Sequence, residues 1–101
     1  MAIIDKSFSG KKIVAHKGDV IQIDLAENAT TGYVWKIKSI DDKQLQVKKN
    51  ENTLAGSGIG GGGMHTFYID VISEGTSELH IALGNPWEND TEETFSITIE
   101  S

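Results

Sequence analysis

The chain has 101 residues, a formal net charge of −6 and no cysteine, with 38% hydrophobic and 24% charged residues. This size predicts one domain, residues 1–101, with a modest hydrophobic core. The lack of cysteine excludes disulfides, thiolate metal sites and a cysteine nucleophile. The acidic balance argues against nucleic-acid partners, which need a basic stripe, and against an anionic membrane surface.

The start of the chain, MAIIDKSFSG, lacks the apolar stretch of a signal peptide. No apolar run in the sequence approaches the roughly 20 residues that span a bilayer. We therefore expect either a cytoplasmic protein or an extracytoplasmic one (periplasmic, vesicular or secreted) from which a leader has been removed.

Period-two alternation of apolar and polar residues recurs along the chain, as in Ile21, Ile23 and Leu25, which alternate with Gln22 and Asp24. Such alternation predicts half-buried strands. The predicted strands cover residues 20–25, 33–38, 44–48, 65–72, 78–83 and 94–100, with one or two more near 3–8 and 12–16. Little room is left for helix. The sequence predicts an all-β fold, an immunoglobulin-like antiparallel β-sandwich of about seven to eight strands.

The connections between these strands alternate between short and long. Residues 17–19, 39–43 and 73–77 form short polar connections, whereas the intervening connections are longer and rich in glycine or aromatic residues. If each strand crosses the sandwich once, alternate connections lie at the same end. The three long loops, Asn28–Tyr33, Gly56–Met64 and Gly84–Asp90, are therefore predicted to share one rim of a rigid scaffold, a typical place for a binding surface.

The three loops carry distinct sequence motifs. The first reads NATTGYVW from Asn28 to Trp35, the second GSGIGGGGMHTF from Gly56 to Phe67, and the third GNPWE from Gly84 to Glu88. Together, from about Val14 to Ile99, they resemble the chagasin-like inhibitors of papain-family cysteine peptidases. That family has an N-P-T-T-G-[YF]-x-W loop, a G-x-G-G loop and an R-P-W loop in this order.

The resemblance implies a role for each loop. The first would enter the active-site cleft of the peptidase and lie over its catalytic cysteine, with Thr31 closest to it. The second would contact the non-primed side of the cleft through its backbone, and Trp87 of the third would pack against aromatic residues on the primed side. The implied peptidase-binding residues are Asn28, Ala29, Thr30, Thr31, Gly32, Tyr33, Gly58, Ile59, Gly60, Gly61, Gly62, Gly63, Met64, Asn85, Pro86 and Trp87.

Two residues depart from the family pattern. Ala29 stands where the family usually has proline, which removes a fixed φ angle and predicts a less preorganised first loop. Asn85 stands where it has arginine, which removes a cation able to pair with carboxylates or stack on aromatic rings.

Simpler structural interpretations stand beside these roles. Trp35 shares a strand face with Tyr33 and Ile37 and is interpreted as a core residue. Trp87 could cover the end of the core or anchor a partner. The hydroxyls of the first loop could simply shape a turn. The glycine-rich loop holds six of the eleven glycines; it could be an inert connection, and we expect it to be mobile in the free protein. It lacks the Lys-Ser/Thr pair of a phosphate-binding loop.

No catalytic or metal-binding pattern is present. His16, His65 and His80 are scattered without ligand spacing, and His65 is expected to be structural or to edge the rim. No serine–histidine–aspartate arrangement can be assigned, so we expect neither an enzyme nor a cofactor. The acidic run Asp90, Glu92 and Glu93 is interpreted as a solvated loop.

The sequence thus predicts a reversible, tight-binding inhibitor of papain-like (cathepsin-type) cysteine peptidases, monomeric when free. The alternative is an immunoglobulin-like adhesion or ligand-binding module that uses the same loops on another surface. Two glycosylation sequons, at Asn28 and Asn89, fall in the proposed contact loops. Because a glycan on Asn28 would collide with a cleft, we expect the active protein to lack it.

Overall fold

The computed structural model describes residues 2–28, 33–54, 62–85 and 91–101. Strands dominate these residues, and a single turn of 3-10 helix, η1, lies between the first two strands. In chain order the elements are β1 (Ala2–Asp5), η1 (Lys6–Phe8), β2 (Lys11–Val14), β3 (Val20–Asn28), β4 (Val34–Ile40), β5 (Leu45–Leu54), β6 (Gly62–Val71), β7 (Thr76–Gly84) and β8 (Thr91–Glu100).

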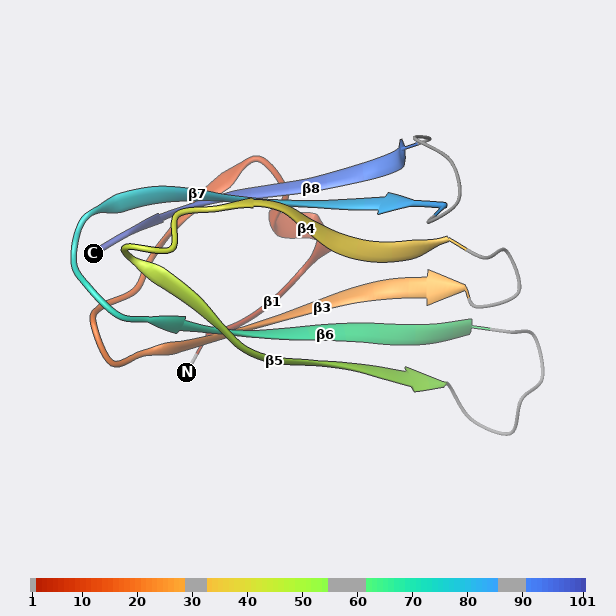
Figure 1. Cartoon of the computed structure of the whole chain (residues 1–101), viewed down its shortest axis with the longest axis horizontal. Helices are drawn as coiled ribbons and strands as arrows, with labels where there is room; N and C mark the ends of the chain where they lie inside the picture. Colours follow the sequence, from red (N-terminus) through yellow and green to blue (C-terminus); the bar gives the residue numbers. More distant parts are fainter. Residues whose placement is uncertain (1, 29–32, 55–61, 86–90) are drawn as a thin grey trace.

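The strands form two packed sheets of four, with strand orders β1-β3-β6-β5 and β2-β8-β7-β4 (Figure 1). The predicted all-β sandwich is confirmed, with eight strands; the finer immunoglobulin-like description stays a prediction. The expected purely antiparallel pairing is wrong at two edges, because β1 pairs with β3 in parallel and β2 pairs with β8 in parallel. Between β1 and β2 the chain crosses from one sheet to the other, so each of these short strands joins a different sheet edge.

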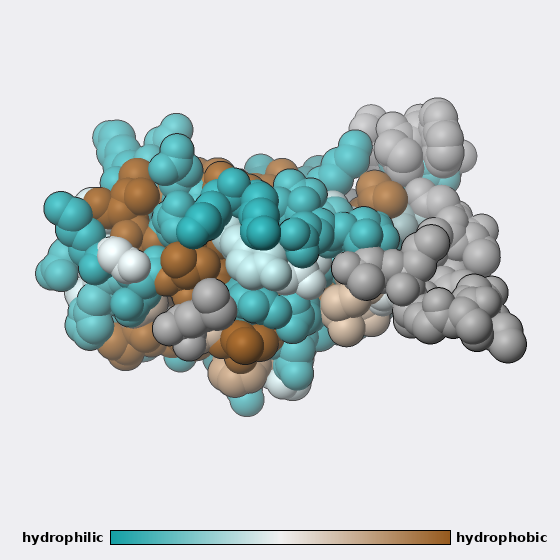
Figure 2. Space-filling view, turned by 90° about the horizontal axis from the view of Figure 1, so that it is seen from below, coloured by the Kyte–Doolittle hydropathy of each residue, from teal (hydrophilic) through white to brown (hydrophobic). Residues whose placement is uncertain are grey.

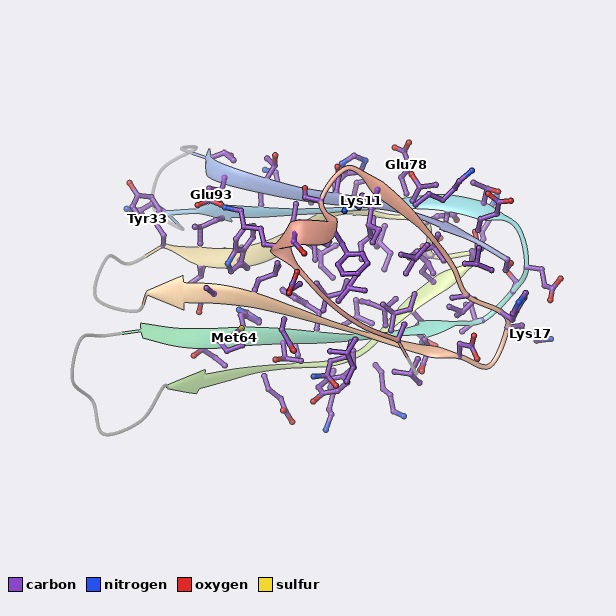
Figure 3. All side chains as sticks on the ribbon, turned by 180° about the vertical axis from the view of Figure 1, so that it is seen from behind. Lys11, Lys17, Tyr33, Met64, Glu78 and Glu93 are labelled. Carbon is purple, nitrogen blue, oxygen red and sulfur yellow. The ribbon has the colours of Figure 1, made fainter. Side chains whose placement is uncertain are left out.

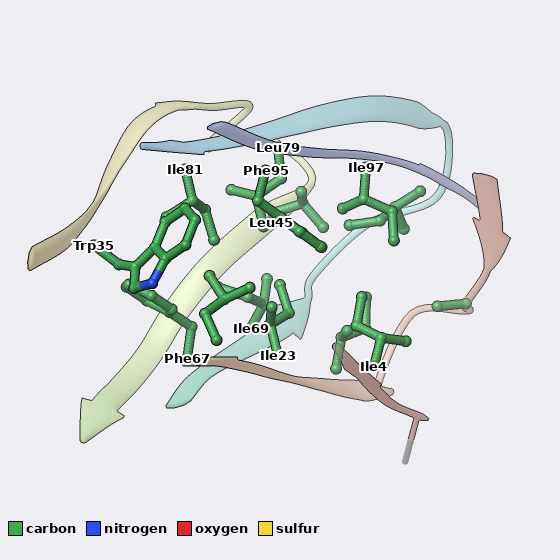
Figure 4. Close-up of a cluster of buried hydrophobic side chains, with 14 of the residues drawn as sticks. Ile4, Ile23, Trp35, Leu45, Phe67, Ile69, Leu79, Ile81, Phe95 and Ile97 are labelled. Carbon is green, nitrogen blue, oxygen red and sulfur yellow. The ribbon is translucent and has the colours of Figure 1, made fainter. Parts of the chain in front are cut away.

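The core lies between the sheets and follows the predicted alternation (Figure 4). Ile21, Ile23 and Leu25 of β3 are completely buried, as are Leu79 of β7 and Phe95 of β8. Full burial of each such side chain contributes roughly 1.5–3 kcal/mol. The tight packing of these side chains makes the sandwich a rigid support for its connections.

Two strands reach farther than the sequence predicts. β5 continues past residue 48 to Leu54, and β6 begins at Gly62 rather than at residue 65. The polar segment KKNENT has weak strand propensity, but it pairs in antiparallel register with β6, from Asn50 opposite Phe67 to Leu54 opposite Gly63. A register shift between Val47 and Lys49 marks a bulge in β5. Pairing with the next strand, β6, therefore overrides the local preference.

The end of the sandwich with the short connections is closed by tight turns. Gly18 adopts a φ of 96° and its N–H donates to Val71 O at 2.8 Å. Gly75 adopts a φ of 139°, and its carbonyl oxygen accepts from Nε2 of the buried Gln44 at 2.7 Å. These conformations favour glycine, which explains the residue type in both turns.

The outer surface is largely hydrophilic. In the space-filling view of one face, hydrophobic residues form small separate groups among polar ones (Figure 2). The large hydrophobic residues that are exposed in the described chain are Ile3, Val14, Met64 and Ile72. Scattered apolar residues of this kind are normal on a protein surface. Among the described residues, no helix is long and apolar enough to cross a membrane.

Candidate functional site

The strand ends that flank the three long connections lie together at one end of the sandwich (Figure 1). Asn28, the last residue of β3, pairs with Gly62, the first residue of β6. Leu54 at the end of β5 pairs with Gly63. In the other sheet, Gly84 at the end of β7 pairs with both Val34 and Thr91. We call this end of the molecule the loop end; the arrangement agrees with the prediction from connection lengths.

The described part of the predicted binding set occupies the loop end. Asn28 ends β3, Tyr33 directly precedes β4 and packs against the core, and Asn85 directly follows β7. Tyr33 and Met64 project near this end, whereas Lys17 marks the opposite end (Figure 3). The remaining predicted contacts, Ala29, Thr30, Thr31, Gly32, Gly58, Ile59, Gly60, Gly61, Pro86 and Trp87, lie outside the described residues.

One part of the predicted second loop is strand instead. Gly62, Gly63 and Met64 are the first three residues of β6 and pair with both β3 and β5. The prediction of a loop from Gly56 to Met64 is therefore wrong at its C-terminal end. Two neighbouring strands supply main-chain partners there, which outweighs the low strand propensity of glycine. Met64 keeps an exposed side chain, at 40% of its full accessibility.

Trp35 is a core residue, as predicted, and also holds two strands together. Its side chain is buried, with 3% exposure, between the sheets (Figure 4). Its indole Nε1–H donates to Ala26 O at 2.8 Å. This bond satisfies the polar atom of a buried tryptophan and links β4 of one sheet to β3 of the other, directly below the first loop.

A buried polar cluster lies at the base of the loops. Glu27 follows Leu25 on the inward face of β3, and its side chain is only 2% exposed. Its Oε2 accepts from the backbone N–H of Trp35 at 2.7 Å and lies 3.0 Å from Nδ1 of His65. Its Oε1 accepts from Nδ2 of Asn52. The carboxylate thus has partners on β4, β5 and β6.

His65 is the second buried member of this cluster. Its Nε2 lies 3.1 Å from Asn50 Oδ1, and its ring stacks on Phe67 with centroids 4.4 Å apart. The predicted structural role of His65 is therefore supported by its contacts. Sequence reasoning missed the cluster as a whole. The signal was present, because Glu27 continues the inward series of Ile21, Ile23 and Leu25, and His65 shares the face of Phe67.

The described residues contain no group of three or more histidine, aspartate or glutamate side chains that could hold a metal ion. Pairs such as His80 and Glu78, 3.0 Å apart, lie on the exposed surface. What the loop end offers chemically is a set of closely spaced strand ends, each supported by main-chain pairing and by buried hydrogen bonds. Such a site can bind another surface by shape.

Solved structures share this fold. The cysteine protease inhibitor EhICP2 from Entamoeba histolytica superposes with a TM-score of 0.87 at 18% identity, over 98% of this chain and 93% of that one. PbICP-C, solved in complex with falcipain-2, gives a TM-score of 0.60 at 17% identity, over 96% of this chain and 85% of that one.

Sequence comparison gives the family. Chagasin from Trypanosoma cruzi is 22% identical over 95% of this chain and 92% of its own length. The family model described as "Chagasin family peptidase inhibitor I42" matches residues 14–99, nearly the whole chain, and includes every strand from β3 to the penultimate residue of β8. The chain therefore belongs to the chagasin family of peptidase inhibitors.

Proposed function

We propose that this protein inhibits papain-like cysteine peptidases by inserting the three loops of the loop end into the active-site cleft. The observation that carries the proposal is the family match over residues 14–99. Two related proteins add support: EhICP2 is described as a cysteine protease inhibitor, and PbICP-C was solved bound to falcipain-2.

Each loop has its own part in the proposed mechanism. The first loop, with Thr31 at its centre, lies over the catalytic cysteine and excludes substrate and water. It resists cleavage because its peptide bonds stay outside the geometry that nucleophilic attack requires. The inhibitor therefore needs no reactive group of its own, and inhibition is reversible.

The second and third loops extend the contact on either side of the cysteine. Gly58, Gly60 and Gly61 allow the backbone to approach the cleft closely, because they have no Cβ atom. Trp87 offers a large aromatic surface on the opposite side, and aromatic residues of this kind supply much of the energy of protein interfaces. Three such loops suit an interface of standard size, about 1,600 Å² in total.

The scaffold explains why the loops can act together. The first loop joins β3 and β4, which belong to different sheets, while the second joins β5 to β6 within one sheet and the third joins β7 to β8 within the other. Strand pairing therefore restrains both ends of every loop. Restraint before binding reduces the entropy that association must overcome, which favours affinity.

Titration of the protein into papain and a cathepsin-type peptidase, with a fluorogenic substrate, tests the proposal. We expect stoichiometric loss of activity, with no effect on trypsin as a serine-peptidase control. The bound inhibitor should also protect the catalytic cysteine from iodoacetamide, and activity should return on dilution. Full activity of several papain-like enzymes in the presence of excess protein would instead favour an adhesion or ligand-binding module.

A further inference from the structure

The inward face of β3 changes character as the strand approaches the first loop. Ile21, Ile23 and Leu25 are completely buried and apolar, but the next inward residue is Glu27, whose carboxylate is almost fully buried. An apolar residue would continue the core at this position without the desolvation that a buried carboxylate requires. A departure from the local pattern of this kind points to a role beyond filling space.

The partners of Glu27 are the strands that carry the loops. The contacts of its Oε2 reach the main chain of β4 at Trp35 and the side chain of His65 on β6, while Oε1 reaches Asn52 on β5. Glu27 itself lies directly before the first loop. One carboxylate therefore connects both ends of the first loop with both ends of the second.

The connection to Trp35 extends the influence of Glu27 to the third loop. Among the described strands, β4 is the outermost of its sheet and has a paired neighbour on one edge, β7. Glu27 accepts the Trp35 N–H, and Trp35 pairs with Leu83 of β7, close to the end of that strand. The carboxylate thereby fixes the distance between the two sheets at the loop end.

We propose that Glu27 is a positioning residue for inhibition: its buried carboxylate sets the relative placement of the loop-bearing strands without touching the peptidase. This inference rests on the proposed function of the loops. Hydrogen bonds to a carboxylate are strong and directional, and removal of the acceptor leaves the buried Trp35 N–H without a partner. The strand ends should then separate slightly, and the loops should fit one cleft less well.

In this proposal, the placement of the loop-bearing strands depends on the hydrogen bonds of the Glu27 side chain rather than on its charge. A His65 ring protonated on both nitrogens would donate to Glu27 and to Asn50. A neutral ring with its proton on Nδ1 would keep the Glu27 contact, and the Asn50 amide would turn to donate to Nε2. A glutamine at position 27 could likewise keep its partners, with its oxygen toward Trp35 and His65 and its amide toward a rotated Asn52.

Three variants separate positioning from general stability. Glu27→Leu removes both acceptor atoms, Glu27→Gln keeps the hydrogen-bonding shape, and Gln44→Leu is the matched control. Gln44 is also buried, with 3% exposure, and it bonds to Gly75 at the end of the molecule opposite the loops. Inhibition constants and dissociation rates for papain would be measured beside the melting temperature, at a temperature where all variants are folded.

We expect Glu27→Leu to raise the inhibition constant about ten- to hundredfold, chiefly through faster dissociation. Glu27→Gln should inhibit nearly as well as the parent protein. Gln44→Leu should lower the melting temperature and leave the inhibition constant unchanged. The proposal is overturned if Glu27→Leu inhibits like the parent. It is equally overturned if Gln44→Leu weakens inhibition as much as Glu27→Leu for the same loss of melting temperature.

If Glu27→Leu does not fold, Asn52→Ala decides the question. Asn52 is an exposed residue on β5, so its truncation should be tolerated, and it removes only the contact between Glu27 and that strand. We expect a severalfold weaker inhibitor with an almost unchanged melting temperature; a fully active Asn52→Ala protein would overturn the proposal.

Amide hydrogen exchange on the free protein separates this inference from the proposed function. Glu27→Leu should accelerate exchange at residues 33–35 and 62–65 and leave residues 79–81 protected. Gln44→Leu should leave the exchange rates at residues 33–35 and 62–65 unchanged. If the parent protein inhibits no papain-like peptidase, the proposed function fails. The exchange pattern still shows whether Glu27 positions the strands, and unaltered exchange at residues 33–35 would contradict that.

Discussion

The two tryptophans show how the same residue type serves different purposes within one small protein. Trp35 is buried between the sheets and bonded to the Ala26 carbonyl oxygen. Trp87 follows Pro86 in the third loop, in a segment with no alternating pattern. The first should therefore be measured by stability and the second by inhibition.

Trp35→Ala is expected to lower the free energy of unfolding by about 3–5 kcal/mol, because it removes a large buried ring and leaves a cavity. Urea denaturation followed by far-UV circular dichroism would measure the change. A loss below about 1 kcal/mol, typical of a surface substitution, would contradict the core position of this residue.

Trp87→Ala is expected to weaken inhibition of papain by about 1–3 kcal/mol, as truncation of an aromatic anchor does at other interfaces. The melting temperature should hardly change. Steady-state inhibition and differential scanning fluorimetry give the two values. A large loss of stability would show instead that Trp87 covers the end of the core.

At the scale of elements, the strands and turns divide the molecule into a structural end and a loop end. The turn at Gly18 is tight. Gly18 has a positive φ angle, and the hydrogen bond from its N–H to Val71 O fixes the main chain in this conformation. β5 and β6, by contrast, carry their pairing outward to Leu54 and Gly62, where the second loop begins. Substitutions at the end with the short turns should accordingly change stability, and substitutions at the loop end should change inhibition.

Gly18→Ala tests this separation. A Cβ at position 18 would meet no atom within 4 Å, so the expected destabilisation comes only from the backbone conformation and amounts to about 1–2 kcal/mol. Inhibition should stay at the parent level at temperatures where the protein is folded. Lys17→Ala, in the same turn, is the control and should be neutral in both measurements. Weakened inhibition by Gly18→Ala alone would show that the two ends are coupled.

At the scale of the whole molecule, the sandwich brings together connections that are far apart in the chain. Asn28 pairs with Gly62 in one sheet and Gly84 pairs with Thr91 in the other, and these strand ends lie at the same end of the molecule (Figure 1). Any bulky group attached at this end should interfere with the entry of the loops into a cleft, wherever its attachment site lies in the sequence.

A glycan on Asn28 would be such a group. Protein made in a glycosylating secretory host with Asn28 occupied should lose inhibition, and enzymatic removal of the glycan should restore it. An Asn89→Gln background confines the modification to Asn28, and intact mass spectrometry reports the occupancy. A fully occupied protein that still inhibits would show that Asn28 stays outside the contact with the peptidase.

Much of the fold could be predicted from short-range patterns. Alternation at Ile21, Ile23 and Leu25 indicated a half-buried strand, and the same pattern in the later strands indicated an all-β sandwich. Because alternate connections lie at the same end of a sandwich, the three long loops were predicted to share one end, which agrees with the described strand ends (Figure 1). The parallel edges β1 and β2 could not be predicted in this way, because alternation shows which face of a strand is buried but not which strand lies beside it.

By itself the sequence determined most of the strands, their buried faces, the order of the loop motifs and the family resemblance, because these depend on residues close together in the chain. Only the tertiary structure decided how the loop end is built. Glu27 has partners 8, 25 and 38 residues away along the chain, and β6 draws the polar half of β5 into the sheet. The bond to Trp35 forms only when the two sheets have packed, and the contacts with Asn52 and His65 form only when β3, β5 and β6 have paired. A buried carboxylate is tolerated at position 27 because folding brings its donors to it.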